Sequence, residues 1–232
     1  MMNLDYTVIR KPYRRNASIT VSQDNRISVI VPKYLPDHRI QDMIREKSVW
    51  IMKVIEKNLK FQHLYKPKTY ANGETFSYLG KDLRLSLTYD GRGEIRASED
   101  EIHVPIPFPE AGYDHSKFVS SQLNQWGRMR AVRILKERVS FYEAVMNVKA
   151  AEVRVKKVES VWGSCNSKGN LTFNWRIVMA PIPVIDYVVV HELAHILHHN
   201  HSDRFWRQVE SVIPDFRERR KWLRQNSRAL KW

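Results

Sequence analysis

The chain has a single cysteine, Cys165, among its 232 residues, so no disulfide can form within it. The same scarcity excludes a zinc site built from four cysteines, and a lone thiol fits a reducing compartment. No apolar stretch reaches about 18 residues, so no membrane span is predicted. The N-terminal segment has neither the apolar run nor the small-residue cleavage site of a signal peptide. We therefore expect a cytoplasmic protein that does not bind membranes.

Motifs that mark nucleotide or nucleic-acid sites are missing as well. The sequence has no glycine-rich phosphate loop, no carboxylate cluster suited to Mg²⁺ and no nucleic-acid-binding motif. The net charge is nevertheless +14, with a concentration of basic residues near the C-terminus. This charge has two interpretations. It can attract an anionic partner, such as nucleic acid or a nucleotide, or it can be a solubilising surface that repels its own kind.

Hydropathy alternates between short strand patterns and helical patterns, which predicts an α+β fold. Turns are expected at 23–25, 80–82 and 91–93. The proline-rich stretch 104–112 is the best candidate boundary. It separates a predicted N-terminal β-rich lobe with one long helix, residues 1–108, from a catalytic domain, residues 109–232, although the two can pack as one unit. Strands are expected at 18–22, 26–32, within 73–104, at 152–160 and at 170–180, and helices at 37–60, 115–147 and 183–199.

The predicted helix 183–199 carries the most informative motif. It is apolar on nearly every side, as buried helices are, so its polar residues need partners. His191, Glu192 and His195 form the pattern H-E-x-x-H. Residues four apart share one helix face, so both imidazoles can reach one ion. Glu192 lies about 100° round the axis, where it can take a proton from a metal-bound water.

A catalytic zinc site needs a third protein ligand and an open position. His198 shares the helix face, but it lies about 10.5 Å along the axis from His191. His201 follows Asn200, a residue type that tolerates the left-handed backbone ending many helices, so a turn there can bring His201 back to the ion. We therefore favour His201 and expect His198 and His199 in the pocket or on the surface. Carboxylates of later residues are the alternatives, namely Glu210 and Glu218.

The order of motifs in the C-terminal half resembles a known family. The runs are WGSC at 162–165, NWR at 174–176, HELAH at 191–195 and NHS at 200–202, followed by Phe205-Trp206. Together with the strand pair at 18–32 and the segment 73–80, they resemble the YgjP-like metallopeptidase family, which is related to the SprT and WLM zinc proteases. The resemblance implies a zincin-like α+β fold, with His191, His195 and His201 as ligands and Glu192 as the acid/base.

Trp162, Asn174 and Trp175 are candidates for the substrate cleft, because zincin-like proteins often bind an extended peptide along a strand beside the active helix. Core packing is the competing interpretation for all three. Cys165 is a candidate ligand or redox thiol, but a small residue in a tight turn is the simpler interpretation.

The sequence thus predicts a hydrolase with Zn²⁺ as its cofactor, most simply a peptidase that acts on peptides or proteins. One alternative enzyme is a metal-dependent nucleotide or phosphoanhydride hydrolase, and another is a protease brought to its targets by nucleic acid. A zinc protein without catalysis is a third alternative. A fourth has His191 and His195 as core histidines bonded to carbonyl groups, with Glu192 paired to an arginine.

Overall fold

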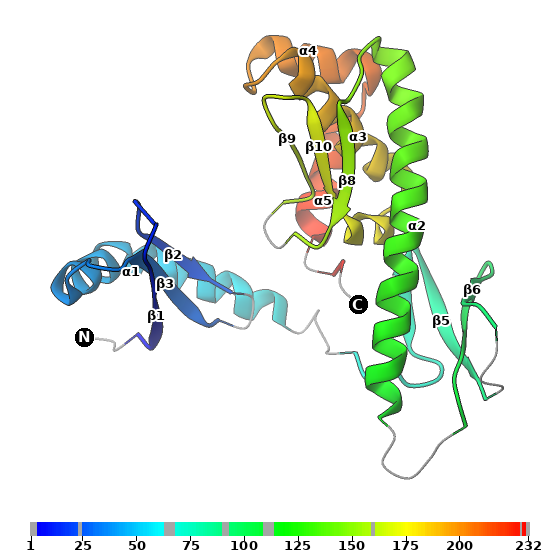
Figure 1. Ribbon diagram of the computed structural model, residues 1–232, viewed down its shortest axis with the longest axis horizontal. Helices are drawn as coiled ribbons and strands as arrows, with labels where there is room; N and C mark the ends of the chain where they lie inside the picture. The colour runs from blue at the N-terminus through cyan, green and yellow to red at the C-terminus, as the bar shows by residue number, and fades with distance from the viewer. Residues whose placement is uncertain are drawn as a thin grey trace. The chain divides into compact units, whose positions relative to one another are not determined.

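The computed structural model describes residues 4–22, 25–62, 68–89, 93–108, 114–158, 161–227 and 229–230. The described residues form a mixed α+β structure with five α-helices and three small sheets. The chain divides into two compact units, Met1–Lys66 and Pro67–Trp232. Figure 1 shows the chain as a ribbon, with most of its helices and strands labelled. None of the helices in the described chain has the length and apolarity that crossing a membrane requires.

The first unit packs a three-stranded sheet against one helix. Its elements are β1 (Tyr6–Lys11), β2 (Ser18–Val21), β3 (Ile27–Pro32) and α1 (Asp37–Gln62). The strand order is β1-β3-β2, with β3 parallel to β1 and antiparallel to β2, so the expected strand pair is confirmed. Alternate β3 residues are buried in one core with Ile40, Ile44 and Ile51 of α1. In the expected turn at 23–25, Gln23 and Asp24 lie outside the described residues.

The second unit holds the other two sheets and four helices of the described chain. Its elements are β4 (Thr75–Tyr78), β5 (Lys81–Thr88), β6 (Arg96–Ala97), β7 (Glu101–Pro105), α2 (His115–Met146), β8 (Glu152–Lys156), β9 (Gly163–Cys165), β10 (Asn170–Asn174), the 3-10 helix η1 (Trp175–Met179), α3 (Ile182–Leu197), α4 (Asp203–Val212) and α5 (Phe216–Asn226). The sheet orders are β4-β5-β7-β6 and β8-β10-β9. Gly91 and Arg92, from an expected turn, lie outside the described residues.

The β4–β7 sheet packs with the C-terminal elements. In the turn between β4 and β5, the backbone N–H groups of Leu79 and Gly80 donate to the carbonyls of Val178 and Met179 at 2.7 and 3.2 Å. Gly80 has φ +80, and a Cβ there would lie 2.6 Å from Pro181 Cγ, so this contact requires glycine. Buried residues of this sheet share one core with α2 and α3. The structural division therefore lies at 66/67, whereas the proline-rich stretch suggested 108/109.

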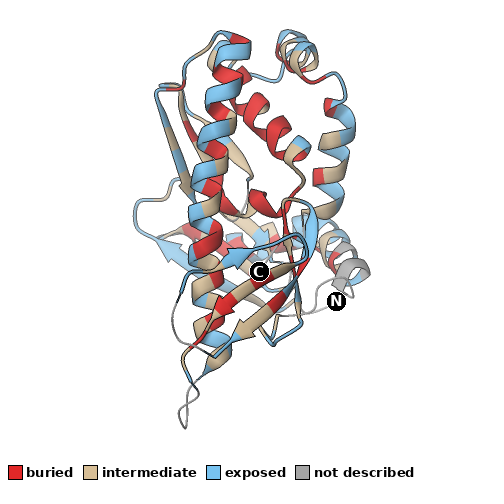
Figure 2. Ribbon diagram, turned by 90° about the vertical axis from the view of Figure 1, so that its right-hand side faces the viewer, coloured by how far each residue is buried: buried red, intermediate tan, exposed pale blue. Residues whose placement is uncertain are grey.

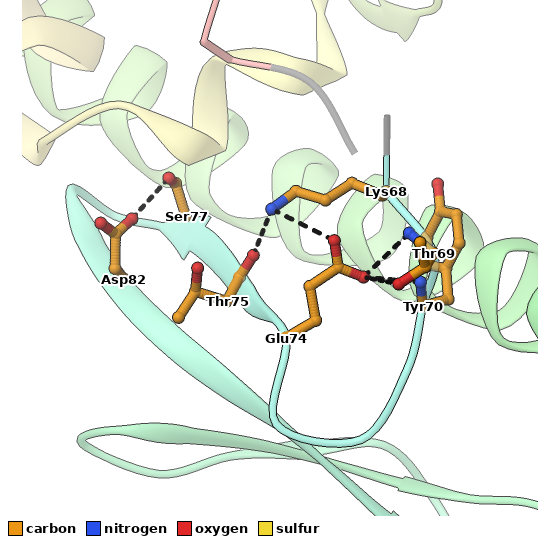
Figure 3. A network of polar contacts seen from close by, with 7 residues as sticks. All are labelled: Lys68, Thr69, Tyr70, Glu74, Thr75, Ser77 and Asp82. Carbon is orange, nitrogen blue, oxygen red and sulfur yellow. Dashed lines mark hydrogen bonds and ion pairs between the residues drawn. The ribbon is translucent and has the colours of Figure 1, made fainter. Parts of the chain in front are cut away.

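The first described residues of this unit are held by Glu74, as Figure 3 shows. Its carboxylate accepts hydrogen bonds from the backbone N–H groups of Thr69 and Tyr70 at 3.0 and 2.6 Å and lies 3.8 Å from Lys68 Nζ. Ser116 Oγ at the start of α2 donates to the carbonyl of Thr69 at 2.9 Å. These bonds fix the segment 68–70 between the sheet and α2.

Helix α2 contacts β8, η1 and α3, and β9 contacts α3. The N-cap Asp114 accepts from Lys117 N, and α2 ends at Asn147 in the left-handed conformation. Arg138 of α2 forms a bidentate ion pair with the buried Asp186 of α3, at 2.6 and 2.9 Å. This pair fixes the two helices side by side.

The strand expected over 170–180 ends early, at Asn174. The Asn174 side chain accepts a hydrogen bond from the backbone N–H of Arg176, which caps η1. A capping asparagine favours a helical turn over a continued strand, so this expectation was wrong from Trp175 onwards.

Candidate metal centre

Helix α3 positions the motif because its apolar residues bury it. Pro183 lies in its first turn, where the missing N–H group costs nothing, and residues 184–190 are all buried. Figure 2 shows α3 coloured as buried along most of its length. The helix ends at His198, which has an extended backbone with φ −136 and ψ 102. Asn200 has no positive φ, so the expected left-handed turn there was wrong, and the chain returns through extended residues instead.

Three imidazoles meet at this end of α3. One ring nitrogen of each of His191, His195 and His201 lies within 4.8 Å of the other two. The Nε2 atoms of His191 and His201 are 3.1 Å apart. Nitrogens bound to one zinc at its usual bond length would be separated by about 3.3 Å in tetrahedral geometry. The three side chains therefore converge closely enough to share one ion.

The backbone fixes which nitrogen of His195 faces the cluster. Its Nδ1 lies 3.1 Å from the carbonyl oxygen of His198. A carbonyl can only accept, so Nδ1 carries the hydrogen and Nε2 keeps its lone pair. His191 Nδ1 is buried and has no hydrogen-bond partner among the described residues. The proton of a neutral His191 can thus stay on Nδ1 while Nε2 faces the other rings.

Burial favours the neutral form of His191 and His195. Burial, together with repulsion from His195, His201 and Arg220, lowers the pKa of His191 to about 3. Burial also lowers the pKa of His195. Neutral imidazole is the form that binds a metal, so His191 and His195 are prepared for a cation at neutral pH.

Two aromatic residues of α4 support the cluster. Phe205 is fully buried, and its ring centroid lies 4.9, 4.6 and 4.8 Å from those of His191, His195 and His201. Trp206 stacks on the His201 ring at 5.6 Å and 24°. Sequence reasoning cited this pair for the resemblance but assigned it no role. The signal was an aromatic pair one helical turn after His201.

Glu192 lies in a tight pocket beside the cluster. It is 5% exposed, and burial raises the pKa of its carboxyl to about 8. A Cβ at Gly163 of β9 would lie 2.6 Å from both Cγ and Oε1 of Glu192. Only a glycine lets the strand approach this closely, so β9 defines one wall around the carboxyl group.

The other candidate residues lie along the same sheet. Asn174 and Trp175 are 6% and 1% exposed, and the Asn174 amide donates to the carbonyl of Val158 at 2.7 Å. Their burial agrees with the core-packing interpretation. Trp162 is half-buried and donates from Nε1 to Ser227 Oγ at 3.2 Å. Cys165 lies on β9 rather than in a turn, and burial raises its pKa, with the charge of Glu192 acting in the same direction.

The alternative third ligands lie away from the cluster. Glu210 forms an ion pair with Arg217 on α5. His198 supplies its carbonyl rather than its ring to His195. Among the described residues, the cluster of potential metal ligands comprises His191, His195 and His201.

The chain is similar to known metallopeptidases. A family model described as YgjP-like, metallopeptidase domain, matches residues 15–226. The chain belongs to the YgjP-like metallopeptidase family. The resemblance is thereby confirmed, and membership supports a metal-dependent peptidase in general terms. A solved structure, the metallopeptidase zymogen of Pyrococcus abyssi abylysin, is 21% identical, covers 39% of this YgjP-like chain and 93% of its own, and has a TM-score of 0.36. No curated protein matches the chain.

Proposed function

We propose that this YgjP-like protein is a zinc metallopeptidase with His191, His195 and His201 as ligands and Glu192 as the general acid/base. The convergence of three imidazoles, with one ring nitrogen of each within 4.8 Å of the other two, carries the proposal. Imidazole nitrogen suits zinc, and three protein ligands are the usual number for a hydrolytic zinc site. A bound zinc supplies a Lewis acid for the peptide carbonyl and lowers the pKa of a water ligand to about 7.

Glu192 provides the proton transfer in this proposal. Its carboxylate takes a proton from the attacking water and later gives one to the leaving amine. Burial raises the pKa of Glu192 to about 8, which suits a group that must hold a proton for part of the cycle. The positive charge of a bound ion would lower this pKa, in the opposite direction to burial.

Strand β9 is the proposed docking edge for the substrate. It lies at the edge of the β8-β10-β9 sheet, contacts α3, and carries the glycine that touches Glu192. An extended peptide that hydrogen-bonds to this edge would lie beside the carboxyl group. Trp162, directly before β9 and half-buried, is the cleft candidate that remains accessible.

The proposal also covers the catalytic region of the chain, its fold and its location. All four site residues lie in 109–232, which supports a catalytic role for that part of the chain. We propose a zincin-like core, which family membership supports, and a cytoplasmic location, which the single cysteine supports.

The test compares Glu192→Gln with His201→Ala on zinc-reconstituted protein, using labelled casein and elemental analysis. Glu192→Gln should keep its zinc and lose about 10²-fold or more in activity, because only proton transfer is removed. His201→Ala should lose zinc. A fully active Glu192→Gln, or His201→Ala that binds zinc as tightly as wild type, would contradict these roles. Nucleoside triphosphates in the same assay test the phosphoanhydride alternative.

A further inference from the structure

A second cavity lies between α2 and η1 in the same unit as the metal centre. It has a volume of about 620 Å³, a size typical of small-molecule sites. We call it the Arg128–Arg176 pocket. Side chains from four segments line it, including Tyr70, Ser120, Asn124, Arg128, Lys157 and Arg176. None of the proposed metal ligands lines it, and neither does Glu192.

The lining of the Arg128–Arg176 pocket is basic and polar. Three of its residues are cationic, and none of the described residues that line it is acidic. Neither arginine takes part in an ion pair within the described part of the chain, whereas Arg138, Arg217 and Arg219 all do. Positive charges gathered around a cavity repel one another, and a bound anion would relieve that repulsion.

The buried Trp175 holds both arginines in place. The guanidinium carbons of Arg128 and Arg176 lie 5.9 and 5.8 Å from its ring centroid, and Trp175 is 1% exposed. Stacking on a rigid aromatic ring limits the freedom of a guanidinium group, so less entropy is lost when it binds a ligand. Arg176 is further constrained because its backbone N–H donates to Asn174 Oδ1 at 3.1 Å.

One donor of a pocket-lining arginine has no hydrogen-bond partner among the described residues. Arg176 Nε is buried without a hydrogen bond among the described residues. Buried polar atoms in proteins almost always have partners, and exceptions gather at functional sites. This unpaired donor distinguishes Arg176 from a surface arginine whose guanidinium group is fully hydrated.

Contacts with Glu74 hold Tyr70, another residue that lines the pocket. Glu74 accepts from the backbone of Thr69 and Tyr70 and pairs with Lys68, and it does not line the cavity (Figure 3). Tyr70 has φ +57, a conformation that these bonds to Glu74 hold in place. Contacts within the protein therefore fix the Tyr70 part of the lining.

We propose that the Arg128–Arg176 pocket binds the phosphate group of a small molecule. A phosphate monoester carries a charge of about −1.5 to −2 at neutral pH, which matches two fixed guanidinium groups better than a carboxylate does. Planar guanidinium groups bind phosphate oxygens through paired hydrogen bonds, and Ser120 and Asn124 add polar groups beside them. The site is independent of the metal centre and of peptidase activity.

Calorimetric titration of the zinc-loaded full chain with inorganic phosphate, sulfate and acetate at constant ionic strength tests the proposal. Phosphate should saturate one site and acetate should bind far more weakly. Arg128→Gln and Arg176→Gln should each weaken phosphate binding about tenfold or more, the usual effect of losing a charge-assisted hydrogen bond. Arg133→Gln removes the same charge from an exposed position on α2 outside the pocket, so it should bind within about twofold of wild type.

Equal losses in all three variants would assign phosphate binding to the general basic surface and overturn the pocket. Binding of acetate as tight as that of phosphate would overturn the preference for a dianion. Because Arg128 is exposed, its variant should fold even if Arg176→Gln does not, and thermal melting checks this. A ten-nucleotide thymidine oligomer tests the other source of phosphate. A protein that binds the oligomer but not inorganic phosphate, and that keeps the oligomer when phosphate is in excess, would also refute a small-molecule site.

Discussion

Replacing Gly163 with alanine tests how closely β9 must approach Glu192. The new Cβ would lie 2.6 Å from Cγ and Oε1 and 2.8 Å from Cδ of Glu192. Ordinary carbon contacts begin at about 3.5 Å, so the carboxyl group or the strand must move by about 1 Å. A misplacement of that size costs about 10²-fold in catalysis, and overpacking of a filled interior costs about 1–3 kcal/mol in stability.

The assay is kcat/KM on a quenched fluorescent peptide, measured together with zinc content and thermal unfolding. We expect Gly163→Ala to keep zinc, because the glycine touches Glu192 and not the imidazoles. Ser167→Ala is the matched control, since Ser167 is exposed in the turn after β9, outside the proposed docking strand, and should leave activity unchanged. A Gly163→Ala protein with wild-type kcat/KM and unchanged melting would refute the reasoning about this contact.

Three further predictions concern stability. In metal-free protein, folding raises the pKa of Glu192 from 4.5 to about 8, so the free energy of unfolding falls as pH rises from 4.5 to 8. Folding lowers the pKa of His191 from 6.5 to about 3, so the free energy of unfolding rises between pH 3 and 6.5. The two slopes offset each other between pH 4.5 and 6.5, so urea unfolding should show a loss of up to about 2 kcal/mol from pH 6.5 to 8 that Glu192→Gln abolishes. Arg138→Met leaves the Asp186 carboxylate buried without its partner and should cost about 3 kcal/mol in urea unfolding, with recovery in the Asp186→Leu double variant. Phe205→Ala removes a fully buried ring beneath three imidazoles and should cost about 3–5 kcal/mol and weaken zinc binding in a competition assay with a chelator.

Each of these predictions has an outcome that contradicts it. A metal-free protein whose stability does not change between pH 6.5 and 8 would mean that Glu192 is hydrated rather than buried. Full stability of Arg138→Met would mean that the pair with Asp186 does not join α2 to α3. Unchanged zinc affinity in Phe205→Ala would show that the Phe205 ring does not position the three histidines.

Local patterns predicted the elements whose residues interact within one helix or one turn. The pair His191 and His195 depends only on helical spacing, so the sequence sufficed to place it on one face. Helix α2 ends at Met146, one residue before the expected bound, because its cap at Asn147 is local. The position of His201 beside the other two histidines depends on the backbone of several residues after α3. A left-handed turn was expected at Asn200, but the structure has an extended backbone at His198 instead.

Contacts between distant segments were beyond the sequence pattern. Strand β9 consists of Gly163, Ser164 and Cys165, small residues typical of turns, and only its pairing with β10 makes it a strand. The β4–β5 turn gives no hint that Leu79 bonds to Val178, some hundred positions away, which joins that sheet to the C-terminal core. Burial of Trp175 likewise depends on α2 packing over η1.

Anomalous scattering at the zinc absorption edge, from crystals of protein reconstituted with one equivalent of zinc, tests the central claim most directly. The proposal predicts a single strong peak with His191 Nε2, His195 Nε2 and a ring nitrogen of His201 at about 2.0–2.1 Å, and a fourth position open beside Glu192. A peak elsewhere, or one bound by Glu210 or Glu218 in place of His201, would contradict it.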